Sequence, residues 1–117
     1  RDVAVTGVQT CALPILFSSR HDDLNQQLNA WLEQVSGWVV INGVSLDSND
    51  YGHCLALLYE KSEPGRYYRA HVFFGSGHTF LEEEANRGLQ EAQAHWGRFV
   101  AIGSNQYGHC LCIIEER

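Results

Sequence analysis

Two stretches of the chain carry the same motif, NDYGHCL at residues 49–55 and NQYGHCL at residues 105–111. Both follow the pattern N-x-Y-G-H-C-L, and position 49 recurs at position 105, an offset of 56 residues. An apolar run continues each copy, ALLYE in the first and CIIEE in the second. A match of this length indicates an internal duplication, which decides the fold before any single element is assigned.

The duplication extends upstream of the motif. There the offset becomes 57 residues, at which Leu24 aligns with Leu81 and Asn29 with Asn86. One single-residue gap reconciles the two offsets. The same pieces therefore recur in the same order along the chain.

Each repeat is expected to fold as strand, helix, strand, strand. In the first repeat, a helix is predicted over about residues 23–35, with Asp22 as its N-cap and Gly37 as its stop. Its apolar stripe has the spacing of one helical face and consists of Leu24, Leu28, Leu32 and Val35. Strands are predicted over residues 39–46 and 53–60, because both stretches are apolar and rich in strand-forming residues.

The second repeat shows the same order. A strand over residues 67–74 precedes a capping box at Thr79 and Glu82, and a helix is predicted from there to about His95. The last two strands are predicted over residues 99–104 and 109–116.

The fold class is therefore α+β, a tandem β-α-β-β repeat with two helices packed on one face of a mainly antiparallel sheet of about six strands. Residues 16–117 form a single domain made of repeats 16–61 and 66–117. The motif strands carry apolar residues on both faces, as strands buried on both sides do. We therefore expect the second face of the sheet to meet another subunit in a homodimer or higher homo-oligomer.

Residues 1–15, RDVAVTGVQTCALPI, resemble a translated sequencing adapter. The codons GTT CAG ACG TGT GCT CTT CCG ATC encode residues 8–15. This resemblance implies an artefact of sequence assembly, so Cys11 carries no functional weight. We expect part of residues 8–18 to substitute for a first strand and residues 1–6 to be loose.

Composition excludes several classes of function. The net charge of −6 disfavours binding of long nucleic acid, which rewards basic patches. No apolar run has the length of a membrane span. The three cysteines outside the adapter segment, Cys54, Cys110 and Cys112, indicate free thiols in a reducing compartment, and we expect the cytoplasm of a bacterial host.

The pattern D-L-N-x-x-L-N-x-W-L at residues 23–32, followed by an apolar strand pair, resembles a family of short sporulation-expressed bacterial proteins that consist of one βαββ unit. The resemblance covers each half of the chain in turn. It implies the fold and brings no assigned chemistry.

The turn that enters each helix is a candidate anion site. It reads GSGHT at residues 75–79 and SSRHD at residues 18–22, and a helix N-terminus presents free backbone N–H groups and a partial positive charge. The alternative is that both are ordinary caps and tight turns. Asp22 opposes an anion in the first copy. The candidate ligand-binding residues are Ser19, Arg20, His21, Ser76, Gly77, His78 and Thr79.

The motif itself supplies a second group of candidates. Tyr51 and Tyr107 are suited to stack on a base, and His53 and His109 to hydrogen-bond it. The alternative is structural: the glycine opens a strand, the cysteine is a small core residue, and the histidine lies at the strand edge.

No catalytic, metal or cofactor site is predicted. Adjacent strand residues such as His109 and Cys110 diverge, and neither C-x-x-C nor H-x-x-x-H occurs in the chain. Trp31, Trp38 and Trp96 are expected in the core or at an interface.

The preferred hypothesis is non-enzymatic binding of a small phosphorylated ligand, a cyclic nucleotide or an ADP-ribose-type signal. In size and type of site the chain resembles phage proteins that sequester bacterial immune nucleotide signals, which implies a role in immune evasion. The alternative is a structural or protein-interaction domain that forms a symmetric oligomer. A third reading is a small hydrolase that uses His78 or His109.

Overall fold

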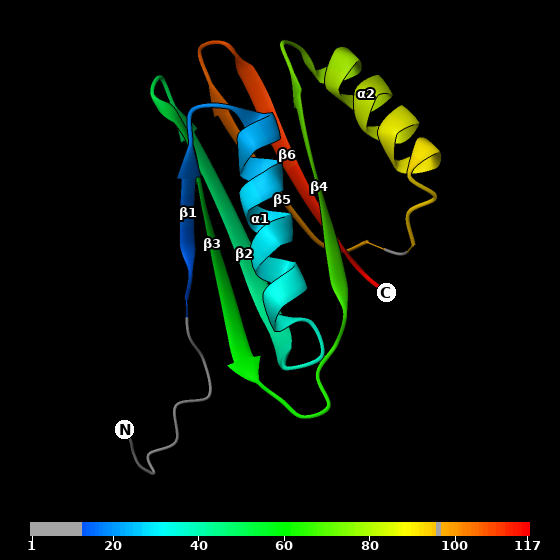
Figure 1. Cartoon of the computed structure of the whole chain (residues 1–117). Helices are drawn as coiled ribbons and strands as arrows, with labels where there is room; N and C mark the ends of the chain where they lie inside the picture. The colour runs from blue at the N-terminus through cyan, green and yellow to red at the C-terminus, as the bar shows by residue number, and fades with distance from the viewer. Residues whose placement is uncertain (1–12, 96) are drawn as a thin grey trace.

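The computed structural model describes residues 13–95 and 97–117 (Figure 1). Within them the order strand, helix, strand, strand occurs twice, as predicted, and the α+β class is confirmed. The elements are β1 (Ile15–Ser18), α1 (His21–Val35), β2 (Val39–Asn49), β3 (Gly52–Lys61), β4 (Tyr68–Gly75), α2 (His78–Glu91), β5 (Gly97–Asn105) and β6 (Gly108–Glu116).

The strands divide into two antiparallel three-stranded sheets, in the orders β1-β3-β2 and β4-β6-β5. The motif strands β3 and β6 are central, as their apolar character requires. β2 runs next to β5, and Asn105 Nδ2 donates a hydrogen bond of 2.9 Å to Asn49 O between them. The pairing register of the β2–β3 and β5–β6 hairpins shifts at equivalent places in the two repeats. The shift lies between Ile41 and Gly43 in β2 and between Gly97 and Phe99 in β5.

Helix α1 forms the centre of the molecule. Leu24, Leu28 and Leu32 are fully buried, and they belong to one core cluster that joins both sheets. The cluster takes Leu55 and Leu57 from one sheet and Cys110, Cys112 and Ile114 from the other. In the β4-β6-β5 sheet, α1 of the first repeat thus covers the Cys110 face of the motif strand.

α1 also closes the outer edge of β4. Asn29 Nδ2 donates to Ala70 O at 2.9 Å, and Asn29 Oδ1 accepts from Ala70 N at 2.8 Å. Asn25 Oδ1 accepts from Val72 N at 3.0 Å. Two side chains of the first repeat thereby satisfy backbone groups that an edge strand would leave without partners.

The predicted N-caps were wrong, whereas Gly37, with a φ of 88°, directly follows the C-cap Ser36 and ends α1 as predicted. Helix α1 begins at His21 with Arg20 as its N-cap, and α2 begins at His78 with Gly77 as its N-cap; neither N-cap side chain makes a capping hydrogen bond to the helix. The capping box from Thr79 therefore does not form, because the helix starts before it. α2 also ends at Glu91, short of His95.

The end of α2 has a physical cause. Arg69 Nη2 donates to Ala92 O at 2.9 Å, and Glu115 Oε1 accepts from His95 N at 3.1 Å. Both bonds draw the chain after Glu91 onto the β4-β6-β5 sheet, and Gln93 adopts a φ of 52° there.

The expected first strand is present in part as β1, and Pro14 O accepts a hydrogen bond of 3.3 Å from Leu57 N. The remaining predictions for residues 1–12, including Cys11, lie outside the described residues, and so does that for Trp96. Trp31 packs edge-on against Tyr59 at a ring distance of 5.2 Å, whereas Trp38 is exposed. Of the helices in the described residues, neither is long and apolar enough to cross a membrane.

Candidate functional site

The candidate residues gather at one end of the molecule. The β2–β3 and β5–β6 hairpins and the turns that enter α1 and α2 all lie there (Figure 1), and we call it the hairpin end. The antiparallel order of each repeat produces this arrangement, because a strand that leads into a helix ends where the following hairpin turns.

The asparagine of the motif shapes each hairpin. Asn49 Oδ1 accepts from Tyr51 N at 2.8 Å and from Gly52 N at 3.2 Å. Asn105 Oδ1 accepts from Tyr107 N at 2.8 Å and from Gly108 N at 3.1 Å. The side chain thus replaces backbone partners within the turn, which explains why asparagine recurs at this position.

The glycine of the motif is required by a close approach. Gly52 and Gly108 have φ values of 153° and 152°. A methyl group on Gly52 would lie 2.4 Å from Ser18 O, and one on Gly108 would lie 2.4 Å from Gly75 O. Each hairpin therefore lies directly against the turn into the helix of its own repeat.

The histidine of the motif pairs with a serine that precedes it by five residues. Ser48 Oγ lies 2.8 Å from His53 Nδ1, and Ser104 Oγ lies 2.6 Å from His109 Nδ1. The two serines were missed in the sequence, although they share the 56-residue offset and extend the motif to S-N-x-Y-G-H. Their pairing fixes the ring orientation of both histidines.

The two histidines differ in their surroundings. His53 is buried, and its burial, followed by the proximity of His21, holds its pKa below the ordinary value. It is therefore neutral at neutral pH. His109 is half-buried, and its ring centre lies 4.6 Å from that of His78 at the start of α2.

The tyrosines of the motif have no such structural explanation. The side chain of Tyr51 is 82% exposed and that of Tyr107 is 61% exposed. A large aromatic side chain repeated on the surface at the same motif position is typical of a contact with a ligand or partner.

A pocket of about 320 Å³ opens between the two repeats at the hairpin end. It brings together six of the predicted residues, Ser19, Arg20, His21, Tyr51, His53 and Tyr107. Asp22, Asp50, Gly52, Phe74 and Asn105 complete its lining. Phe74 belongs to β4 of the second repeat, and its ring centre lies 5.8 Å from those of both His21 and His53. We call this the inter-repeat pocket.

The other five predicted residues, Ser76, Gly77, His78, Thr79 and His109, do not line the inter-repeat pocket. The first four form the turn into α2, and His109 lies beside it through its contact with His78. Gly108 lies between the two places: it follows Tyr107 of the pocket, and a methyl group on it would lie 2.9 Å from Ser76 Cα.

The two helix starts differ in charge. At α1, the Arg20 guanidinium donates to both oxygens of Asp22, at 3.0 Å and 2.6 Å, and this pairing holds the pKa of Asp22 below its usual range. Asp22 Oδ1 also accepts from Asp23 N at 2.9 Å. The first turn of α2 contains no acidic residue and its start has no side-chain cap. The turn into α2 is therefore the better suited of the two to receive an anion.

A buried ion cluster lies outside the predicted site. The fully buried carboxylate of Glu115 contacts His71 Nε2 and accepts from Arg69 Nε at 3.2 Å and Arg69 Nη2 at 3.1 Å. Burial raises the pKa of Glu115, but the hydrogen bonds from His71, His95 and Arg69 outweigh it and lower the pKa overall. The cluster fastens the end of α2 to the sheet. Only the apolar run that directly precedes Glu115 on β6 could have indicated it.

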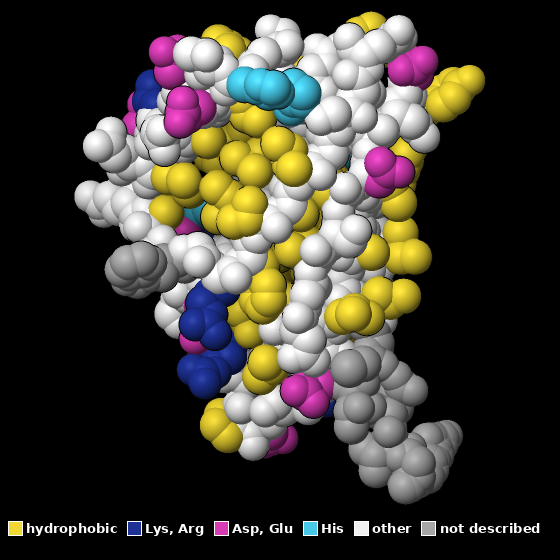
Figure 2. Space-filling model, turned by 180° about the vertical axis from the view of Figure 1, so that it is seen from behind, with side chains coloured by type: hydrophobic (Ala, Val, Ile, Leu, Met, Phe, Trp, Pro, Cys, Tyr) yellow, Lys and Arg dark blue, Asp and Glu magenta, His cyan; other side chains and the backbone are white. Residues whose placement is uncertain are grey.

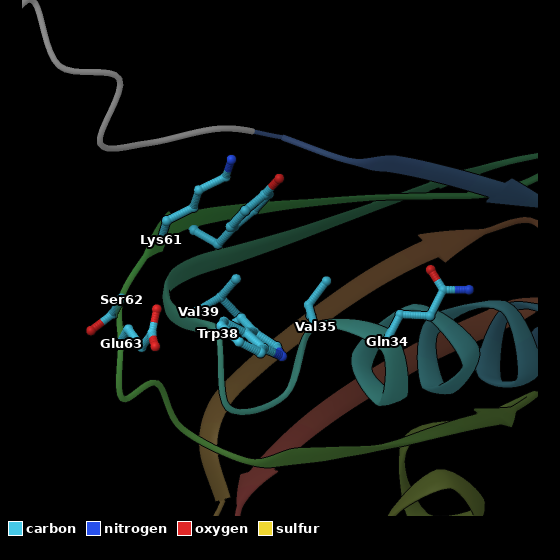
Figure 3. A pocket seen from close by; sticks show the side chains of 8 residues that line it. Gln34, Val35, Trp38, Val39, Lys61, Ser62 and Glu63 are labelled. Carbon is cyan, nitrogen blue, oxygen red and sulfur yellow. The ribbon is translucent and has the colours of Figure 1, made fainter.

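A larger pocket, of about 540 Å³, lies at the opposite end of the molecule (Figure 3). It is lined by Gln34, Val35, Trp38, Val39, Tyr59, Lys61, Ser62 and Glu63, and none of these is a candidate site residue. Among the described residues, no group of three or more acidic, histidine or cysteine side chains is placed to hold a metal ion.

No family model matches the sequence, and neither a curated protein nor a solved structure matches it.

Proposed function

We propose that the chain is a non-enzymatic binding protein whose hairpin end takes a small phosphorylated ligand with a ring, such as a cyclic nucleotide or an ADP-ribose-type signal. The observation that carries the proposal is the pair of exposed motif tyrosines, Tyr51 and Tyr107, on a single pocket that both repeats build. Sequestration of such a signal needs binding and no turnover.

The inter-repeat pocket supports recognition of a ring. Tyr51, Tyr107 and Phe74 supply aromatic surfaces, and the neutral imidazole of His53 stands beside them. Stacking on aromatic side chains contributes about 1–3 kcal/mol per base. The carboxylates of Asp22 and Asp50 disfavour a phosphate in this part of the site.

The turn into α2 supports recognition of the phosphate. Its backbone N–H groups are not used by a side-chain cap, and Ser76, His78 and Thr79 add side-chain donors. A ligand that spans from the pocket past Tyr107 to this turn would use both parts at once.

The proposal is tested by calorimetry and thermal shift with cyclic mononucleotides, cyclic dinucleotides and ADP-ribose, followed by chromatography of the recovered ligand. Recovery of the unchanged ligand supports sequestration. Recovery of a converted ligand would show that the protein is an enzyme and would contradict the proposal. If no ligand of this set binds, the proposal is wrong.

Tyr51→Ala and Tyr107→Ala each test the ring contact, and we expect each to weaken binding about tenfold or more. The matched control is Tyr67→Ala, since Tyr67 is 58% exposed just before β4, away from the hairpin end. His78→Ala tests the phosphate contact. Unchanged affinity in His78→Ala would remove the turn into α2 from the site.

A structural or protein-interaction role is the second candidate. One observation favours it: large apolar side chains are exposed on the sheet faces turned away from α1, among them Phe17, Leu58, Val100 and Ile102.

A further inference from the structure

The inter-repeat pocket has aromatic walls. Tyr51 and Tyr107 line it from the two hairpins, and Phe74 lines it from β4. Tyr51 is 82% and Tyr107 is 61% exposed, so the faces of their rings are open to a ligand. The face of an aromatic ring carries partial negative charge and attracts a cation.

The charged side chains of the lining leave an excess of negative charge. Among the described lining residues, Arg20 is the one Lys or Arg, and its guanidinium donates to both oxygens of Asp22, at 3.0 Å and 2.6 Å. This pair is neutral as a whole. Asp50 lines the same pocket, is exposed, and forms no ion pair with a described residue. Its carboxylate is therefore the unbalanced charge of the pocket.

The N-terminus of α1 does not reverse this balance. It presents a partial positive charge near the pocket, but Asp22 and Asp23 lie in its first turn and offset that charge. Figure 2 has the hairpin end at the top. Acidic and histidine side chains are visible there, and most of the visible Lys and Arg side chains lie lower on the molecule.

One buried polar atom of the lining has no partner. His53 is 4% exposed and its Nδ1 lies 2.8 Å from Ser48 Oγ, but its Nε2 forms no hydrogen bond with a described residue. Burial lowers the pKa of His53, so its ring adds no positive charge at neutral pH. When Nδ1 donates to Ser48, Nε2 presents a lone pair. A ligand N–H that donates to this atom would recover the cost of burying it unpaired.

The turn into α2 has the opposite electrostatic character. The first turn of α2 contains no acidic residue, and its backbone N–H groups are not used by a side-chain cap. In the second hairpin, Gln106 occupies the motif position that Asp50 has in the first. The hairpin end is therefore divided into an acidic aromatic pocket and a turn that favours anions. A ligand with a positive ring and a negative phosphate complements both parts.

We propose that the ring bound in the inter-repeat pocket is cationic, so that the ligand of the hairpin end is a nucleotide with a pyridinium-type ring. This proposal rests on the proposed function, which places the phosphate at the turn into α2. Tyr51 and Tyr107 contact the faces of the ring, and Asp50 balances its charge. His53 Nε2 accepts a hydrogen bond from an amide substituent of the ring.

The test compares two forms of one mononucleotide that differ in the charge of the ring. Nicotinamide mononucleotide has a cationic ring, whereas its reduced form has a neutral ring and the same phosphate. Calorimetry with the full chain at neutral pH should give a dissociation constant about tenfold or more lower for the oxidised form. Equal affinity for the two forms overturns the cationic ring.

Two variants assign this preference to the pocket. Asp50→Asn removes the charge with little change of shape, and Tyr51→Leu removes the aromatic face but keeps an apolar side chain. Each should remove most of the preference of about tenfold for the oxidised form. Asp47→Asn is the matched control, because Asp47 is exposed on β2 of the same hairpin and does not line the pocket. A preference that survives Asp50→Asn and Tyr51→Leu overturns the proposal.

Separate outcomes bear on this proposal and on the proposed function. If a cyclic nucleotide or ADP-ribose binds and neither form of the mononucleotide does, the cationic ring is wrong and the proposed function stands. If none of these ligands binds, both are wrong.

Discussion

The two motif glycines can be tested directly because the chain contains a matched control. Gly52→Ala and Gly108→Ala each place a methyl group 2.4 Å from a carbonyl oxygen. We expect each to lower the free energy of unfolding by about 1–3 kcal/mol. Gly43→Ala, in β2, meets no atom within 4 Å. It should leave the urea midpoint nearly unchanged, and a loss equal to that of Gly52→Ala would contradict the steric explanation.

Glu115 is the second residue whose change has a defined outcome. At neutral pH, Glu115→Gln removes charge-assisted hydrogen bonds to Arg69 and His71, which should cost about 2 kcal/mol of stability. The pKa of Glu115 is lowered in the folded state, so its contribution is full above the unfolded value of about 4.3 and declines as pH falls through the folded value.

The stability gap between wild type and Glu115→Gln should therefore narrow as the pH falls below about 4. Urea titrations of both proteins at several pH values measure this gap. A gap independent of pH would show that the carboxylate is not ionised in the folded protein.

At the scale of elements, the distinctive contact is between α1 and the edge of β4. Asn29→Ala removes two hydrogen bonds to Ala70 and leaves an N–H and a carbonyl without partners, so we expect a loss of about 1–3 kcal/mol. Asn86→Ala is the control, because Asn86 occupies the equivalent position of α2 and is exposed. Its effect should stay within about 0.5 kcal/mol. Equal effects in chemical denaturation would argue against the edge contact.

Both helices and all six strands were predictable, because apolar residues recur in each at the spacing of a helix or a strand. The duplication adds support, since each repeat predicts the same order of elements. The helix N-caps were not predictable. Asp22 and Thr79 are favourable cap residues by type, but the hairpin pressed against each turn starts the helix earlier, at His21 and at His78. A propensity for capping acts locally and does not include this tertiary contact.

At the scale of the molecule, thiol labelling reports how α1 covers the second sheet. Burial raises the pKa of Cys110 and of Cys112 to about 12, whereas Cys54 is exposed. In a Cys11→Ser variant we expect rapid labelling of Cys54 alone at neutral pH. Cys110 and Cys112 should react only in denaturant, and their rapid labelling in the folded protein would contradict the burial of this face.

The position of α1 between the two sheets was not predictable from the sequence. Alternate residues of a strand point to opposite faces, so the sequence shows that β6 is apolar on both. It does not show which helix covers each face. Helix α1 covers the Cys110 face of β6, and a second subunit on the other face stays a prediction. The gathering of the candidate residues at one end could have been predicted from the sequence. The order of elements alone places both turns and both hairpins at the same end of the molecule.

The hydrogen bonds from Asn25 and Asn29 to β4 have a consequence for how the chain can be divided. Each half lacks something that the other provides: the second sheet needs α1 for its Cys110 face, and α1 needs that sheet to bury its outer side. A cut between Ser62 and Glu63 should give two fragments that are poorly folded alone and reassemble when mixed. The two halves of this protein would then act as a split reporter: each fragment is poorly folded alone, and the fold forms only when both are present.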